Sequence, residues 1–222
     1  MKVLAVGAHP DDVELGCGAT LARQAQRGDE VTILVMTDGA LGRIDGMSRR
    51  GEQVEAARRI GATVRWAGFE DGLVPDGPEA IRVIDDAIAA SSADVLYTHT
   101  LDDTHQDHRA TATASLAAGR HLASILQYET PSTLNFSPTV YVDVDATIQE
   151  KLAVLRAHLS QVLRGGPVDL EAIEAQARFR GFQGRLRFAE AFEPIRVGWD
   201  LSTPEVLAPV VPLEVPALRS IG

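Results

Sequence analysis

Short apolar runs alternate with longer amphipathic segments over roughly the first 120 residues. Four runs rich in β-branched residues have the pattern of buried strands of a parallel sheet: 2–7, 31–36, 63–66 and 94–97. Four segments with one apolar helical face lie between or after them: 13–28, 48–60, 80–90 and 109–119. This alternation predicts a βαβ series. We therefore expect an α/β fold whose mostly parallel sheet carries helices on both faces.

The last third of the chain is less regular. Its apolar pattern predicts two strands and then two helices, at 125–128, 139–144, 146–163 and 170–180. Proline recurs after residue 201, so we expect residues 202–222 to form an extended tail. Because the chain has no internal repeat and no linker, we expect one Rossmann-like domain over residues 1–201.

The turn after the first predicted strand carries distinctive chemistry. It reads His9-Pro10-Asp11-Asp12, and Pro10 keeps the helix from beginning before that point. His9 and Asp12 are three residues apart, so their side chains can converge, and both are ordinary Zn²⁺ ligands. Asp11 then points elsewhere and can take a proton from a metal-bound water. The alternative is that Asp11 or Asp12 simply caps the helix.

A second group of the same residue types follows the strand predicted at 94–97. His105, Asp107 and His108 stand there, directly before the next predicted helix. In open α/β sheets, ligands bind at the carboxyl ends of the strands. Two His/Asp groups at strand ends therefore favour one functional site over separate structural histidines.

Composition narrows the classes of function. The 222 residues carry a formal net charge of −10 without any block of Lys or Arg, which argues against binding to nucleic acid or anionic membranes. No apolar run approaches the length of a membrane span or a signal sequence, so we expect a cytoplasmic protein. The single cysteine, Cys17, is interpreted as a small buried apolar residue, with a thiol near a metal as the alternative. Gly16 and Gly18 fall inside a predicted helix, which makes a poor dinucleotide motif.

Together these motifs resemble the PIG-L or LmbE-like family of zinc-dependent de-N-acetylases. The specific matches are His-Pro-Asp-Asp at residues 9–12 and His-Gln-Asp-His at 105–108. Supporting matches extend the resemblance over about nine-tenths of the chain: Thr37-Asp38-Gly39, the Arg49/Glu52/Ala56 helix, 128–132, His158-x-Ser160-Gln161 and 189–192. Ala40 departs from the pattern, since family members often have an acid there, and this puts in doubt a substrate contact from that position.

The resemblance implies a mechanism of metal-assisted amide hydrolysis. It implies that His9, Asp12 and His108 bind one Zn²⁺ per chain, or another divalent ion, with a position left for water. Asp11 would be the general base. His105, held by Asp107, would stabilise the oxyanion or protonate the leaving amine. Asp38 and Arg49 are weaker candidates for holding the sugar, and for Arg49 a place on a solvated helix face is an equal alternative.

The expected function is thus removal of acetyl from an N-acetylglucosamine-type sugar conjugate. Two alternatives stay open: a metal-dependent hydrolase of another bond such as a phosphoester, and a catalytically silent sugar-binding protein. The expected partner is a small amino-sugar conjugate, with no nucleic acid and no membrane span. The resemblance leaves the oligomeric state open, with a homo-oligomer among the options.

Overall fold

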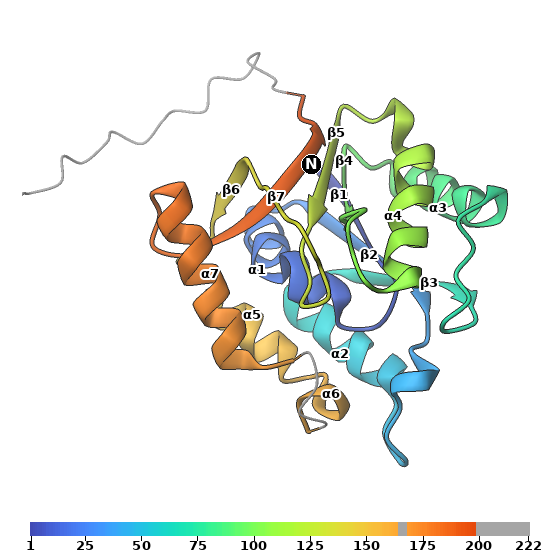
Figure 1. Ribbon diagram of the computed structural model, residues 1–222, viewed down its shortest axis with the longest axis horizontal. Helices are drawn as coiled ribbons and strands as arrows, with labels where there is room; N and C mark the ends of the chain where they lie inside the picture. Colours follow the sequence, from blue (N-terminus) through green and yellow to red (C-terminus); the bar gives the residue numbers. More distant parts are fainter. Residues whose placement is uncertain (164–167, 199–222) are drawn as a thin grey trace, which may run out of the picture.

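The computed structural model describes residues 1–163 and 168–198. The tail predicted at 202–222 lies outside the described residues. The elements run in the order β1 (Lys2–Gly7), α1 (Asp12–Gln26), β2 (Glu30–Thr37), η1 (Ala40–Gly42), α2 (Arg49–Ile60), β3 (Thr63–Phe69), α3 (Pro78–Ser91), β4 (Val95–His99), α4 (Gln106–Ala118), η2 (Gly119–His121), β5 (Ser124–Tyr128), β6 (Val140–Asp143), α5 (Ile148–Leu155), α6 (Leu159–Leu163), α7 (Leu170–Gly184) and β7 (Ala189–Arg196) (Figure 1).

The strands form one seven-stranded sheet in the order β3-β2-β1-β4-β5-β7-β6. The pairs from β3 to β5 are parallel, and the pairs that β7 makes with β5 and β6 are antiparallel. The predicted Rossmann-like, mostly parallel sheet is therefore confirmed. The strand β7 was not predicted, because only its first residues are buried and its second half is polar or exposed.

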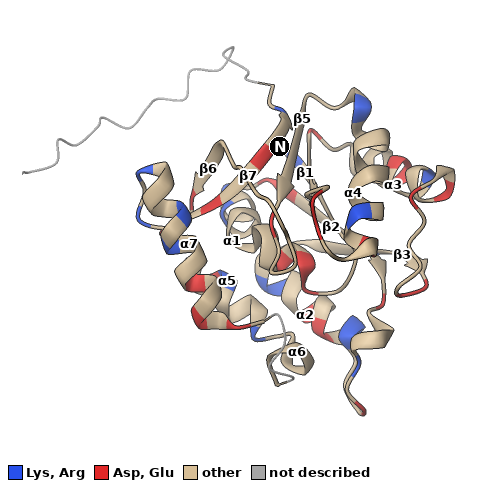
Figure 2. Cartoon of the chain, viewed as in Figure 1, with Lys and Arg blue, Asp and Glu red and all other residues tan. Residues whose placement is uncertain are grey.

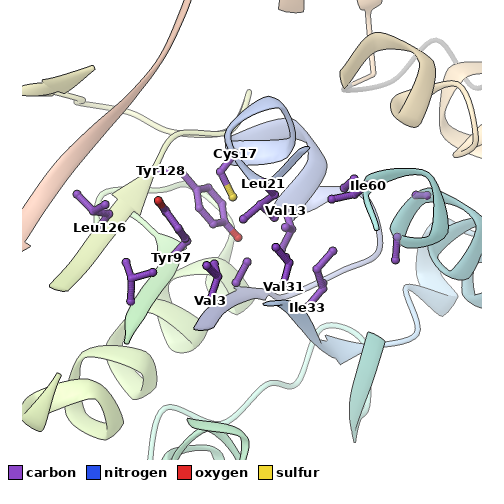
Figure 3. Close-up of a cluster of buried hydrophobic side chains, with 14 of the residues drawn as sticks. Val3, Val13, Cys17, Leu21, Val31, Ile33, Ile60, Tyr97, Leu126 and Tyr128 are labelled. Carbon is purple, nitrogen blue, oxygen red and sulfur yellow. The ribbon is translucent and has the colours of Figure 1, made fainter. Parts of the chain in front are cut away.

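The two faces of the sheet are covered by different helices. On one face, apolar side chains of α1 and α2 pack on alternate residues of the strands, and Figure 3 shows this cluster around Val3, Leu21 and Tyr128. On the other face, α3 and α4 pack on the residues in between, such as Leu4 and Leu96. Helices α5 and α7 form a smaller cluster with Leu15 of α1. Successive side chains of a strand point to opposite faces of the sheet, so the same buried strands contribute to the apolar clusters on both faces.

The sheet changes direction between β1 and β4. The chain builds outward from β1 through β2 to β3, and then returns to place β4 on the other side of β1. Neighbouring loops diverge at such a switch point, which opens a crevice at the carboxyl ends of the strands. Both His/Asp groups follow these two strands, so the topology brings them to one place.

Two predicted helices are interrupted. Helix α1 has a non-helical residue at Cys17, with φ −142° and ψ 18°. The helix predicted at 146–163 ends at Leu155 and resumes at Leu159, because the backbone N–H groups of Ala157 and His158 donate to carbonyls only three residues back. That tighter turn ends the α-helix and turns His158 into the interior, where it is fully buried.

A buried ion pair satisfies the backbone groups on both sides of the interruption in α1. The Nζ of Lys151 in α5 lies 2.6 Å from both the Leu15 carbonyl oxygen and the Glu190 carboxylate in β7. That carboxylate also accepts hydrogen bonds from the backbone N–H groups of Ala19 and Thr20. A cation therefore faces the end of the first half of α1, and an anion faces the start of the second half, which is the arrangement that helix termini favour. Residues from the last third of the chain thus hold the helix that follows the His9 turn.

Cys17 is fully buried within the apolar cluster on this face, where Figure 3 shows its sulfur beside the ring of Tyr128. Burial raises the pKa of the thiol well above its usual value. This agrees with its interpretation as a small buried apolar residue.

Gly16 is required by close contact with Tyr128. A Cβ atom at Gly16 would lie 2.1 Å from the ring of Tyr128, whose hydroxyl donates to the Val6 carbonyl at 2.7 Å. A Cβ at Gly18, two residues along the same helix, would lie no closer than 3.6 Å to Glu14 and Lys151. Two glycines in one helix thus have different steric demands.

We predict that Gly16→Ala destabilises the protein by about 1–3 kcal/mol through overpacking. Gly18→Ala should leave the free energy of unfolding within about 1 kcal/mol, because alanine favours the helix by about that amount. Urea unfolding of both variants measures the difference. Equal midpoints and slopes for the two variants would contradict this account of the Tyr128 contact.

Candidate metal centre

The turn between β1 and α1 directs its two aspartates to different sides. Asp12 points back into the turn, where its Oδ2 accepts the backbone N–H of His9 at 2.7 Å and lies 3.3 Å from the His9 ring Nδ1. Asp11 occupies the N-cap position with φ 90°, and its side chain makes no capping hydrogen bond. The left-handed backbone at Asp11 thus separates two adjacent carboxylates and leaves Asp11 available for other contacts.

The loop between β4 and α4 brings His108 to the same place. The Nε2 of His108 lies 3.4 Å from Asp12 Oδ1, and its Nδ1 lies 3.1 Å from Asp103 Oδ2. The Asp103 carboxylate is itself held by the hydroxyl of Thr130 and the backbone N–H of His105. His9 and His108 therefore each face a different oxygen of the Asp12 carboxylate.

The donor atoms around Asp12 are of the kinds that bind divalent metal ions. Each imidazole has one nitrogen on a supporting carboxylate and the other nitrogen facing Asp12, which is the usual arrangement of metal-binding histidines. The His9 Nδ1 atom lies 3.3 Å from Asp12 Oδ2 and the His108 Nε2 atom lies 3.4 Å from Asp12 Oδ1, so each ring is close to a different oxygen of the carboxylate. One carboxylate and two imidazoles form a mixed donor set suited to zinc.

Groups of metal-binding donor atoms show that His9, Asp12 and His108 lie close to one another's neighbours. The three predicted ligands do not all fall in one group. Within the described residues, three sets of donors lie within 4.8 Å of one another: His9/His105/His108, Asp12/His99/His108 and His9/Asp71/Asp107. Each of His9, Asp12 and His108 belongs to at least one set. Asp12 links the two rings, because one of its oxygens faces each of them.

His99 is a buried neighbour that the sequence did not single out. Its ring stacks on His108 at 4.0 Å between centroids, and its Nε2 lies 3.2 Å from Asp12 Oδ2. That nitrogen accepts the backbone N–H of Ala8 at 3.1 Å, so its lone pair is already used. Burial lowers the pKa of His99 to about 4. We therefore assign His99 a neutral, supporting place beside the candidate metal ligands.

Asp11 is fixed by two residues of α2. The Nη2 of Arg49 donates to Asp11 Oδ2 at 3.1 Å, and the side-chain oxygen of Gln53 accepts the Asp11 backbone N–H at 3.1 Å. Gln53 in turn donates to the fully buried Glu14 at 2.5 Å. Burial raises the pKa of Asp11 to about 6, although the charge of Arg49 opposes that rise. A carboxylate with such a pKa can exchange a proton near neutral pH.

Asp107 supports a different histidine from the one expected. Its Oδ2 lies 3.1 Å from His9 Nε2, and its carboxylate accepts the backbone N–H groups of Gly72 and Val74. Toward His105 it offers only its backbone N–H, which donates to the ring Nδ1 at 3.2 Å. The expectation that the Asp107 side chain holds His105 is therefore corrected, because the first turn of α4 points that carboxylate toward the β3–α3 loop.

Asp71 is a further carboxylate on His9 that no sequence motif indicates. Its Oδ1 lies 3.1 Å from His9 Nε2, and its Oδ2 accepts the backbone N–H of Leu41 at 2.7 Å. Asp71 and Asp107 thus both face one ring nitrogen of His9. Nothing in the local sequence around Asp71 resembles a ligand motif, because it reaches the site from the loop after β3.

The surrounding carboxylates make both candidate ligand rings strongly basic. Burial by itself lowers the pKa of His9, but hydrogen bonds with Asp107, Asp12 and Asp71 outweigh it and raise the pKa to about 12. Burial likewise opposes the shift at His108, whose pKa rises to about 9 because Asp12 and Asp103 lie beside it. A metal ion must displace these protons, so binding of the ion is coupled to proton release.

A pocket of about 330 Å³ opens above these residues, and its volume lies near the lower limit for small-molecule sites. Its lining includes His9, Asp11, Asp12, Arg49, His105 and His108, together with Leu15, Leu41, Gly42, Asp71, Gly72, Gln106, Thr130, Pro131, Ser132 and Gln161. Asp38 is absent from this lining. It accepts the Ala40 backbone N–H and borders a separate hollow beside Trp66. Arg49 is buried against Asp11, so it does not lie on a solvated face.

Comparison with known families agrees with the motifs. The family model described as PIG-L, GlcNAc-PI de-N-acetylase, matches residues 4–119. The uncharacterized deacetylase YaiS of Escherichia coli K12 is 38% identical over 167 residues, which span 71% of this chain and 90% of that protein. The diacetylchitobiose deacetylase of Thermococcus kodakarensis is 25% identical over 189 residues, which span 72% of this chain and 70% of that protein.

A solved structure extends the similarity beyond the matched motifs. A conserved protein of Thermus thermophilus superposes with a TM-score of 0.82 at 30% identity, covering 91% of this chain and 99% of that one. The similarity thus covers the antiparallel end of the sheet as well as the two His/Asp groups.

We predict that Asp107→Asn weakens zinc binding by about 10–100-fold, because it removes a carboxylate that supports His9. Asp102→Asn is the matched control. Its carboxylate accepts from Asn135 and has no contact with the histidine rings among the contacts of the described residues. Competition with a chromophoric chelator measures the affinity of both variants. Equal zinc affinity in the two would show that the Asp107–His9 contact does not support the metal.

Proposed function

The chain belongs to the PIG-L family of de-N-acetylases, whose members named above include amide-hydrolysing deacetylases, and on that premise we propose that it removes the acetyl group from an N-acetylglucosamine-type sugar conjugate in a zinc-dependent reaction. The proposed metal ligands are His9, Asp12 and His108. The proposed substrate is a small amino-sugar conjugate that enters the pocket above them.

The separation of Asp11 from Asp12 is the observation that carries this proposal. Asp12 faces two imidazoles, one from each of its oxygens, while Asp11 faces the pocket from a site fixed by Arg49 and Gln53. A hydrolytic metal site needs both a ligand carboxylate and a separate base. The turn supplies each from adjacent residues.

A bound divalent ion would supply Lewis-acid polarisation of the amide carbonyl and would acidify the attacking water. Asp11 takes the proton of that water as general base, and its raised pKa suits this exchange. Arg49 keeps the Asp11 carboxylate in place through the 3.1 Å contact. We therefore propose Arg49 as a residue that positions the base and lines the sugar site, and we retain Asp38 as a weaker sugar-binding candidate.

His105 is proposed to act on the developing oxyanion. Its Nδ1 accepts the backbone N–H of Asp107, so a neutral ring carries its proton on Nε2. Burial also lowers the pKa of His105 below its ordinary value, which favours the neutral ring. A neutral imidazole N–H is a hydrogen-bond donor to negative charge and a weak acid, so stabilisation of the oxyanion fits better than protonation of the amine. The backbone N–H of Asp107 fixes this tautomer of His105, and the Asp107 carboxylate holds the ring of His9.

Cytoplasmic location and assembly into a homo-oligomer stay predictions. Within the described residues, no helix combines the length and apolar character that crossing a bilayer requires.

We predict acetate release from simple N-acetylglucosamine glycosides by the zinc-loaded protein. Coupled assay of acetate, run beside a phosphodiester substrate, measures the two activities. Hydrolysis of the phosphodiester well above acetate release would favour the phosphoesterase alternative, and sugar binding without any turnover would favour the silent binding protein.

We predict that Asp11→Asn retains zinc and lowers kcat/KM by about 10²–10⁴-fold, the usual contribution of a positioned base. Asp12→Asn should instead lose zinc, because it removes the carboxylate between the two rings. Zinc stoichiometry beside kcat/KM distinguishes the two roles. Full activity in Asp11→Asn, or loss of zinc from that variant alone, would reverse the assignment.

A further inference from the structure

The turn that carries the proposed base has an unusual backbone. The Asp12 backbone N–H donates to the His9 carbonyl oxygen at 3.4 Å, which closes a β-turn over residues 9–12. Pro10 is the second residue of this turn, and Asp11 is the third, with φ 90° and ψ −24°. These angles are close to those of a type II turn, which favours glycine at the third position because φ is positive there. Contacts from elsewhere must therefore hold Asp11 in this conformation.

A type I turn is the less strained alternative for the same residues. It places the third residue at φ of about −90° and ψ of about 0°, and it accepts proline at the second position equally well. Between the two turn types, ψ of the second residue and φ of the third each differ by about 150–170°, so the peptide group between them reverses. The orientation of the Pro10–Asp11 peptide group thus decides where the base points.

Helix α2 binds both ends of that peptide group. The Nη2 of Arg49 donates to the Pro10 carbonyl oxygen at 2.6 Å. The side-chain oxygen of Gln53 accepts the Asp11 backbone N–H at 3.1 Å. Arg49 and Gln53 are four residues apart, so one face of α2 presents a donor and an acceptor together. A reversed peptide group would turn its oxygen toward the Gln53 oxygen and its N–H toward the guanidinium, so the two side chains favour the type II turn.

Glu14 fixes the direction of the Gln53 amide. The Gln53 Nε2 donates to Glu14 Oε1 at 2.5 Å, which leaves the amide oxygen for Asp11. A Gln53 amide turned the other way would set its NH₂ group against the Asp11 N–H and its oxygen against the Glu14 carboxylate. Gln53 is only 1% exposed, so water cannot replace the contacts that would be lost.

His158 supplies a positive charge beside Glu14. The first turn of α1 is acidic (Figure 2), and Glu14 and His158 are both fully buried. The His158 Nε2 lies 3.6 Å from Glu14 Oε2. Burial by itself lowers the pKa of His158, but the Glu14 carboxylate outweighs it and raises that pKa above its ordinary value. The charge of His158 therefore offsets that of Glu14, which would be costly to bury alone.

We propose that Gln53 and Glu14 are positioning residues for the general base, because together they fix the Pro10–Asp11 peptide group and so hold Asp11 in the type II turn. This inference rests on the proposed deacetylase function. It extends that function beyond the pocket, since neither Gln53 nor Glu14 is among the described residues that line it.

The first variant, Gln53→Leu, removes the acceptor of the Asp11 N–H and nearly keeps the side-chain volume. We expect kcat for the methyl glycoside of N-acetylglucosamine to fall by about 10–100-fold, because displacement of a reacting group by about 1 Å can cost that much. KM and zinc stoichiometry should equal those of the parent. Gln24→Leu is the matched control at a second buried glutamine, about three turns farther along α1, and its kcat should equal that of the parent.

The variant of the base provides a sharper comparison. In the Asp11→Asn background, Gln53→Leu should change kcat by less than about twofold, because residues that act as one unit lose their separate effects. Asparagine accepts a positive φ as aspartate does, so the turn can form in that background. A role of Gln53 in the fold alone would lower kcat by the same factor in both backgrounds.

Exchange of the two side chains tests the direction of the amide. Gln53→Glu alone sets two carboxylates against each other and should lower kcat as Gln53→Leu does. When Glu14→Gln is added, the amide at position 14 donates to the carboxylate at position 53, which still accepts the Asp11 N–H. The double variant should therefore recover most of the lost kcat. If it recovers none, the proposal is contradicted even where Gln53→Leu does not fold.

A crystal structure of Gln53→Leu gives a readout that does not depend on turnover. We expect the Pro10–Asp11 peptide group to reverse and φ of Asp11 to become negative, and an unchanged turn would overturn the proposal. Parental kcat in Gln53→Leu would overturn it and leave the deacetylase function intact. Absence of acetate release by the parent would instead refute the proposed function, and the crystal structure would still decide the role of Gln53.

Discussion

Burial of several aspartate carboxylates at one edge of the sheet is the constraint on which the centre depends. Asp11, Asp12, Asp103 and Asp107 are each at most 4% exposed, and each would be costly to bury unless charge or hydrogen bonds compensated it. Arg49 pairs with Asp11, and backbone N–H groups and the Thr130 hydroxyl donate to Asp103 and Asp107. The remaining negative charge falls on imidazole rings, which hold protons far more tightly than usual. The same charge that retains those protons provides the attraction for a divalent ion.

Most of the fold could be predicted because the local pattern and the final environment agree. Strands such as β1 and β2 are buried on both faces, so their apolar runs are continuous and unambiguous. The break at Cys17 could not be predicted, because it depends on Lys151 and Glu190, which come from distant parts of the chain. Likewise β7 has a polar, exposed half that carries no strand signal, and it becomes a strand by pairing with β5 and β6.

The candidate site shows the same division between local and distant information. The convergence of His9 with Asp12 follows from their spacing, and the arrival of His108 follows from the parallel pairing of β1 and β4. The supporting contacts do not follow from spacing. Asp71 approaches from the β3–α3 loop, and the Asp107 carboxylate points to His9 because Gly72 and Val74 of that loop bind it. A motif identifies the residues that carry the chemistry, whereas packing decides which of them touch.

The buried ion pair of Lys151 and Glu190 bears on which part of the chain can fold by itself. The family model spans residues 4–119, yet both halves of α1 have their broken ends satisfied by side chains beyond residue 150. A fragment that ends at residue 119 would leave these backbone groups without their side-chain partners. The groups lie in the helix that follows the turn with Asp11 and Asp12. The segment that the family model matches is therefore shorter than the part of the chain that must fold together. Transfer of residues 4–119 alone into another scaffold would not preserve the candidate metal centre.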